Sequence, residues 1–96
     1  MSRLQDKFIL TVVTPKGVEY TADCDTVLLN ICEGKNGTQS GSYGVKKGHA
    51  NAVFALAGGK ITVKKDGRIL YSFDALDGFA VMQDNVLTVT VEDIKK

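Results

Sequence analysis

The amino-acid sequence predicts an all-β protein, a small β-sandwich of about ten short strands. Apolar and polar residues alternate with a period of two in several segments. Turn dipeptides rich in Gly, Asp and Asn separate these segments at intervals of about ten residues. No window shows the 3.6-residue period of an amphipathic helix convincingly. Evenly spaced short strands of this kind are typical of a sandwich or a barrel.

The first expected strand is "FILTVV", residues 8–13, which is apolar on both faces. A strand in the middle of a sandwich has this character because both of its faces are covered. The turn residues Thr14 to Gly17 end it, since Pro and Gly favour turns. Two further strands are expected over residues 18–22 and 25–32.

Four of the later strands are separated by clear turn signals. The alternating segments "KITVKK" and "RILYSFDAL" flank Asp66-Gly67. This dipeptide is a strong hairpin signal because both central residues of a type I′ turn need positive φ. The segments "FAVMQ" and "VLTVTVE" flank Asp84-Asn85 in the same way. The alternation predicts these inward-facing sets: Ile61 and Val63; Ile69, Tyr71 and Phe73; Leu87, Val89 and Val91.

Two segments are less clear. The alanines of "HANAVFALAGGK" are compatible with a helix, but turn signals at both ends favour a strand over residues 51–57. Residues 33–44, "EGKNGTQSGSYG", are polar and rich in Gly and Ser. They are expected to form a long loop, which is either mobile or a contact surface.

Size and charge exclude several classes of function. Ninety-six residues form a single domain, expected to span residues 1–96. The 12 basic and 11 acidic residues form no basic stripe, which argues against nucleic-acid binding. No signal peptide and no apolar run of membrane-spanning length occurs, so we expect a soluble, cytosolic protein without membrane insertion. Cys24 and Cys32 have no zinc-binding spacing and are expected to be buried thiols.

The segment "GSYGVKKGHAN", residues 41–51, is the strongest candidate for chemistry. A phosphate-binding loop would lead into a helix, whereas this segment leads toward a strand, so Gly41, Gly44 and Gly48 are expected to shape a loop. His49, the single histidine, could serve as a base in a hydrolase with Ser42. No nucleophile motif accompanies it, and a structural histidine that donates to the backbone is favoured. No metal site and no cofactor are expected.

The order of these motifs resembles the N-terminal β-sandwich domain of the F-type ATP synthase epsilon subunit. The similarity begins with "FILTVVTPKGVEYTADCDTVLL" and continues with the Gly-x-x-Gly-Val-x-x-Gly-His-Ala pattern of "GSYGVKKGHA". It extends through the "KITVKKDGRILYSF" hairpin and Asp77-Gly78-Phe79 to the final strand that starts at Asn85. The resemblance covers essentially the whole chain.

The resemblance implies a non-catalytic rotor subunit at the foot of the central stalk, linking the gamma subunit to the membrane c-ring in proton-driven ATP synthesis. Thr14 and His49 would lie near gamma, and Ser42 and Tyr43 would belong to a loop that contacts the c-ring. The complex would lie at the cytoplasmic face of the bacterial plasma membrane.

The chain also departs from the family pattern. Lys46-Lys47 replaces the usual Leu-Pro, Asn51 replaces a Pro, and Ser42 stands where Glu is common. The family usually continues into a two-helix C-terminal hairpin, whereas this sequence ends at "VEDIKK", so either the form is short or a second domain lies outside it. An alternative function is a free-standing β-sandwich that binds a ligand or a protein without a role in ATP synthase.

Overall fold

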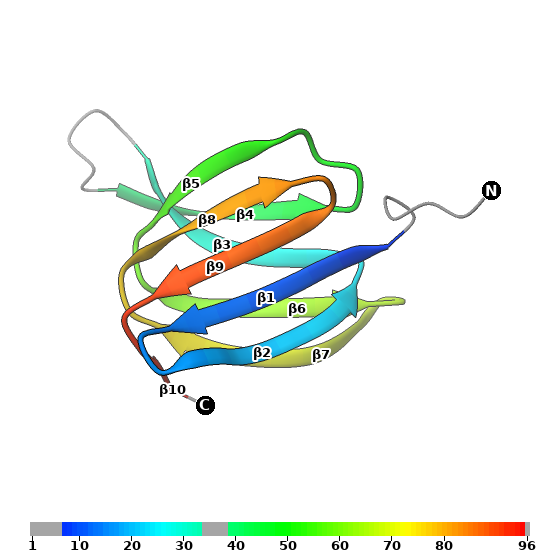
Figure 1. Ribbon diagram of the computed structural model, residues 1–96. Helices are drawn as coiled ribbons and strands as arrows, with labels where there is room; N and C mark the ends of the chain where they lie inside the picture. Colours follow the sequence, from blue (N-terminus) through cyan, green and yellow to red (C-terminus); the bar gives the residue numbers. More distant parts are fainter. Residues whose placement is uncertain (1–6, 34–38, 96) are drawn as a thin grey trace.

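The computed structural model of the protein describes residues 7–33 and 39–95 (Figure 1). The described residues form ten β-strands and no helix, which confirms the predicted all-β class. The strands are β1 (Phe8–Thr14), β2 (Gly17–Cys24), β3 (Thr26–Glu33), β4 (Gln39–Lys46), β5 (Ala52–Leu56), β6 (Gly59–Lys65), β7 (Arg68–Ala75), β8 (Gly78–Gln83), β9 (Val86–Val91) and β10 (Ile94–Lys95).

The ten strands form two layers of a sandwich that remain hydrogen-bonded to each other through β3. Sheet I has the order β5-β8-β9-β1-β2 and lies in front in Figure 1, and sheet II has the order β4-β3-β6-β7-β10 behind it. Residues Thr26 to Leu28 of β3 pair with β6, and Ile31 pairs with Leu56 of β5, so β3 spans the junction. Strands β1 and β9 are parallel, and the other pairings of described strands are antiparallel.

The chain changes sheets three times at one end of the sandwich, from β5 to β6, from β7 to β8 and from β9 to β10. The backbone N–H of Ala57 donates to the Asn30 carbonyl at 3.0 Å, and that of Leu76 donates to the Asp93 carbonyl at 3.1 Å. Gly78 lies so close to β9 that a Cβ atom there would meet the Thr90 carbonyl oxygen and Val91. The end of the sandwich therefore consists of closely packed backbone.

Alternate side chains of both sheets form the core, as the period-two pattern predicts. Phe8, Leu10 and Val12 of β1 are completely buried. The predicted inward residues of β6 and β9 are also buried, and they are Ile61, Val63, Leu87, Val89 and Val91. Burial of a large apolar side chain contributes about 1.5–3 kcal/mol, so this shared interior is the main source of stability.

Two predictions about strands need correction. Residues 39–44 are not a loop, because β4 pairs with β3 from Glu33↔Gln39 to Thr26↔Lys46. A polar, Gly-rich strand is possible here because β4 is an edge strand, and Gly44 leaves room for the Leu28 side chain, 3.3 Å from where a Cβ would lie. Ile69 is exposed rather than inward, because the pairing of β6 and β7 shifts register after Val63. Residues 34–38 of the predicted loop lie outside the described residues.

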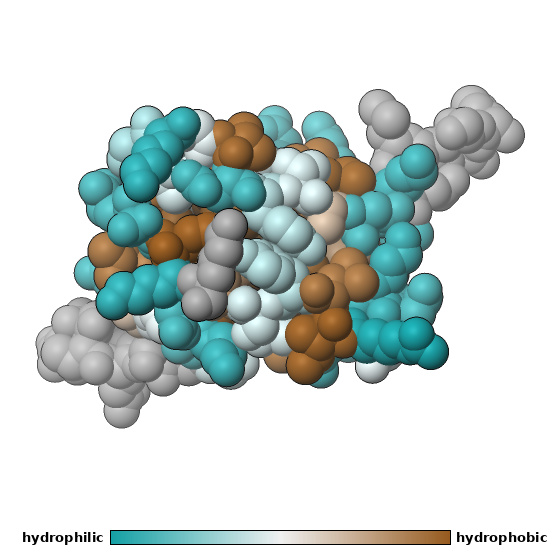
Figure 2. All heavy atoms as spheres, turned by 90° about the horizontal axis from the view of Figure 1, so that it is seen from below, coloured by the Kyte–Doolittle hydropathy of each residue, from teal (hydrophilic) through white to brown (hydrophobic). Residues whose placement is uncertain are grey.

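Aromatic side chains close the side of the sandwich where β2 faces β7. The Tyr20 and Tyr71 rings stack with centroids 4.4 Å apart, and Phe73 lies 5.4 Å from Tyr71. Figure 2 views the molecule from this side and shows residues of intermediate hydropathy across the middle, with hydrophobic groups separated by hydrophilic ones. This side of the molecule therefore carries no broad hydrophobic patch.

Gly78 is expected to be essential for the sheet change between β7 and β8. Gly78→Ala places a methyl group against β9 backbone and should lower the free energy of unfolding by about 2–3 kcal/mol. Gly44→Ala is a matched control in a strand, because its Cβ meets only the Leu28 side chain, and we expect a loss below about 1 kcal/mol. Urea unfolding measures both, and equal losses would contradict the close backbone approach at Gly78.

Cys24 is expected to make the protein sensitive to alkaline pH. Burial, together with the nearby carboxylates of Asp23 and Asp25, raises the pKa of the Cys24 thiol from 9.0 to about 11. The folded state thus disfavours the thiolate more than the unfolded state does. The free energy of unfolding therefore keeps this contribution below pH 9 and falls by about 2–3 kcal/mol as the pH rises from 9 to 11. Urea unfolding of Cys24→Ala should show a flatter pH dependence over this range than the parent protein, and an unchanged slope would contradict the assignment.

Candidate interaction surface

The Gly-rich segment of residues 41–51 is partly strand and partly turn. Gly41 and Gly44 lie inside β4, opposite Ile31 and Leu28, so the expectation that they shape a loop is wrong for both. Gly48 lies in the turn between β4 and β5 with φ of +84°, a conformation that favours glycine. The segment carries the chain from sheet II to sheet I and offers no helix N-terminus to an anion.

His49 is held by hydrogen bonds at both ring nitrogens. Nδ1 lies 2.7 Å from the Ala50 carbonyl and must donate to it, since a carbonyl only accepts. Nε2 then accepts from the Tyr43 hydroxyl, 2.9 Å away. The His49 ring also packs on Phe54 and Tyr43, with centroids 5.7 and 5.9 Å apart. This arrangement supports a structural histidine that closes the space between β4 and β5 and leaves no free nitrogen for a nucleophile.

Asn85 joins the turn at Gly48 to two other segments. The Gly48 N–H donates to Asn85 Oδ1 at 2.7 Å, and the Ile9 N–H donates to the Asn85 carbonyl at 2.9 Å. Asn85 is buried and has φ of 65°, which Asn tolerates better than most residues. The sequence indicated only a tight turn at this position, because its partners lie far away in the chain.

The two residues expected near gamma lie at opposite ends of sheet I. Thr14 is buried at the end of β1, where its hydroxyl donates to Glu19 Oε2 at 2.9 Å and accepts from the Lys16 N–H at 3.2 Å. His49 lies beside the Asn85 turn, which contacts Ile9 at the other end of β1. Five residues of extended strand separate Ile9 from Thr14, or about 16 Å.

The two residues expected to contact the c-ring do not share a loop. Ser42 and Tyr43 are consecutive residues of β4 and therefore face opposite sides of sheet II. Ser42 is exposed, whereas Tyr43 is half-buried, packs against the core and bonds to His49. Only Ser42 is thus free to contact a partner through its side chain.

The outer face of sheet I is uncharged over four strands, and we call it the apolar face. On β1 and β9, the residues of this face alternate along the strand with the buried core residues. Neighbouring strands place members of the face side by side, in the pairs Val53↔Val81, Ala55↔Phe79, Phe79↔Thr90 and Ile9↔Val86. Its members are Ile9, Thr11, Val13, Val53, Ala55, Phe79, Val81, Gln83, Val86, Thr88 and Thr90. The outer face of sheet II instead carries charges, among them Lys46, Lys60, Lys64 and Asp74.

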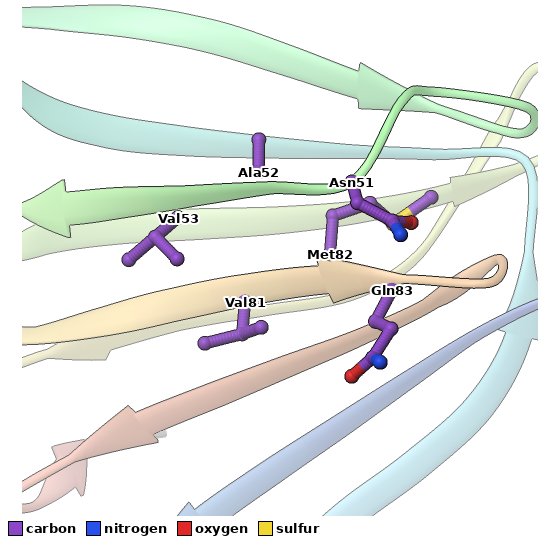
Figure 3. Close-up of a pocket in the computed structure, with 6 residues that line it drawn as sticks. All are labelled: Asn51, Ala52, Val53, Val81, Met82 and Gln83. Atoms are coloured by element: carbon purple, nitrogen blue, oxygen red, sulfur yellow. The ribbon is translucent and has the colours of Figure 1, made fainter.

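A shallow depression lies at one end of β5 and β8 (Figure 3). It has a volume of about 310 Å³ and is lined by Asn51, Ala52, Val53, Val81, Met82 and Gln83. Its polar groups are the amides of Asn51 and Gln83, and its lining includes no ionisable side chain that could act as an acid, a base or a charged ligand.

The described part of the chain offers neither a cluster of metal ligands nor a helix of membrane-spanning length. Residues 7–33 and 39–95 contain no group of three or more potential metal ligands. No helix in these residues is long and apolar enough to span a bilayer.

The fold is a small β-sandwich whose histidine is hydrogen-bonded at both nitrogens and whose main exposed feature is an uncharged face, a surface typical of protein contacts. The chain belongs to the family of the ATP synthase delta/epsilon chain β-sandwich domain, whose family model matches residues 7–96. The predicted resemblance to the epsilon subunit is thereby confirmed.

Individual relatives agree with this family. The chain is 30% identical over 87 residues to the chloroplastic ATP synthase epsilon chain of Daucus carota, covering 91% of this chain and 59% of that one. It is 31% identical to the ATP synthase epsilon chain of a Synechococcus strain, over 86% of this chain and 55% of that one. A chain in the mitochondrial ATP synthase structure of Euglena gracilis has the same fold, with a TM-score of 0.75 at 20% identity over 97% of this chain and 55% of that one. The chain thus spans less than two thirds of these proteins.

Asn85 is expected to stabilise the turn that holds His49. Asn85→Ala removes the acceptor for the Gly48 N–H and a residue that tolerates positive φ, so the free energy of unfolding should fall by about 1–3 kcal/mol. Asn85→Asp keeps an acceptor oxygen and should lose less. Urea unfolding tests both variants, and a change within about 0.5 kcal/mol for Asn85→Ala would contradict this role.

Proposed function

We propose that the protein is a non-catalytic rotor subunit of an F-type ATP synthase, which links the gamma subunit to the membrane c-ring. The observation that carries the proposal is the apolar face on a chain of the epsilon family. In this function the sandwich transmits torque as a rigid body and serves proton-driven ATP synthesis at the cytoplasmic face of the bacterial plasma membrane. Residues 1–96 would form its single sandwich domain.

The side-chain chemistry supports a non-catalytic role. Both nitrogens of His49 are engaged, which disfavours the hydrolase hypothesis with Ser42 as nucleophile. Burial raises the pKa of the Cys24 thiol, so this group is a poor nucleophile at neutral pH. The proposed function instead needs a stiff fold and a specific surface.

The apolar face supports a protein partner because it combines low charge with exposed side chains. Phe79 is 49% exposed and Val53 is 71% exposed in the isolated chain. Four strands about 4.8 Å apart and about six residues long cover roughly 400 Å². A stable interface buries about 800 Å² per partner, so gamma must also contact residues beyond this face.

The residues expected to contact the partners suit this arrangement. Thr14 and His49 lie at the two ends of sheet I. A gamma surface that spans the apolar face would reach the turn after Thr14 at one end and the turn that contains His49 at the other. Ser42 lies on the opposite sheet and would meet the c-ring through its exposed side chain. Tyr43 would act indirectly in this proposal, by holding His49 in place.

The alternative is a free-standing β-sandwich that binds a ligand or another protein. The depression at Asn51 and Gln83 is its structural support, together with Lys46-Lys47 in place of the family's Leu-Pro. The same experiment separates this alternative from the rotor function, because a free-standing module has no affinity for gamma.

The proposed function is tested by mixing the chain with the gamma subunit of the same ATP synthase and measuring binding by co-elution and titration. We expect Phe79→Lys to weaken the complex at least about tenfold, since it places a charge in an apolar contact. Leu70→Lys is the matched control, because Leu70 is 47% exposed but lies on β7 of sheet II. Absence of a complex at micromolar concentrations, or equal weakening by both variants, would contradict the proposal.

A further inference from the structure

Each sheet has two edge strands. Among the described residues, the outer backbone edge of each of these strands is unpaired or only partly paired. In sheet I these strands are β2 and β5, and in sheet II they are β4 and β7, the latter covered by β10 at only two positions. An open edge presents N–H and C=O groups that can pair with another chain. Soluble proteins therefore protect such edges with charges, bulges or cover.

Three of the four edges carry protection of this kind. Strand β2 has Glu19 and Asp23, and its pairing with β1 contains a bulge. Strand β7 has Arg68 and Asp74, a register shift against β6 and partial cover by β10. Strand β4 ends on the exposed Lys46.

Strand β5 differs from the others because its sequence, "AVFAL", contains no charged residue and no Pro. It pairs with β8 in an unbroken register from Ala52↔Met82 to Leu56↔Gly78, so it has no bulge either. On its other side, it pairs with β3 at Ile31↔Leu56. Among the described residues, the edge from Ala52 to Ala55 is therefore open, without a bulge and uncharged.

The surroundings of β5 define which partner fits this edge. Val53 and Ala55 are exposed and belong to the apolar face, and Phe54 is anchored by the Tyr43 and His49 rings on the inner side. Asn51 and Gln83 at the end of the strand pair are uncharged. The nearby carboxylate of Asp84 lies in the turn beyond this end, where the Asp84 N–H donates to Asn51 Oδ1 at 3.1 Å. A charged segment placed along Ala52 to Ala55 would lose hydration without an opposite charge on β5 itself, so an uncharged segment is favoured.

We propose that β5 is a strand-addition site, at which an extended, uncharged segment of the gamma subunit with small apolar side chains pairs with Ala52 to Ala55 and continues sheet I. This mode of binding rests on the proposed function, because gamma is its partner there. Main-chain hydrogen bonds would set the register of the contact, and alternate side chains would extend the apolar face. These backbone and side-chain contacts would supply part of the interface area that gamma needs beyond the apolar face.

The experiment is residue-resolved amide hydrogen exchange of the chain, alone and in complex with gamma. Strand addition should slow exchange at least about tenfold at alternate amides of β5, since every second residue of an antiparallel strand turns its N–H to one neighbour. Amides of the open edge of β2 should exchange at the same rate in both states. Val53→Lys should weaken binding at least about tenfold, whereas Val18→Lys on β2 should not, although Val18 is similarly exposed, at 65% against 71%.

The possible failures can be told apart. A complex with gamma in which the β5 amides exchange as in the free chain would overturn strand addition and leave the proposed function standing. Absence of any complex with gamma would overturn both. A stable homodimer of the chain that protects the β5 amides without gamma would overturn the assignment of gamma, because a second copy would then occupy the edge.

Discussion

The structure depends on one constraint, which is that alternate side chains of both sheets share a single interior. A 96-residue chain has one modest core, so each strand must contribute one face to it. The chain meets this demand by changing sheets repeatedly, and at the end where β5 leads into β6 the two strands form two parts of a nearly continuous run. Close approach of backbones at Gly78 makes that change possible, and the two layers can then enclose Phe8 and its neighbours completely.

The aromatic side chains and His49 help to close this interior. Tyr43, His49 and Phe54 fill the space between β4 and β5, while Tyr20 and Tyr71 fill the space between β2 and β7. Hydrogen bonds to Tyr43 and Ala50 fix the His49 ring, and Asn85 fixes the turn before it. The main features of the described residues are therefore the two outer faces, which differ in charge between the two sheets.

The two sheets therefore offer different surfaces to a partner. Sheet I offers an uncharged face and an unprotected edge at β5, whereas sheet II offers lysines and polar side chains. The proposed stalk function would need two unlike surfaces, and the sandwich has them on opposite sides of one core. The family assignment and the surface chemistry thus support the same kind of function from independent observations.

The sequence alone determined the fold class, most strands and the Asp66-Gly67 turn, where both residues have positive φ, because alternation and turn chemistry are local properties. It also determined the family, since the order of the Gly-His-Ala motif and the hairpins survives the substitutions at Lys46-Lys47. Only the tertiary structure decided that residues 39–44 form an edge strand, because pairing with β3 overrides their weak strand propensity. It alone also separated Thr14 from His49 and joined Asn85 to Gly48, since contacts between distant segments follow from how the two sheets close on their common core.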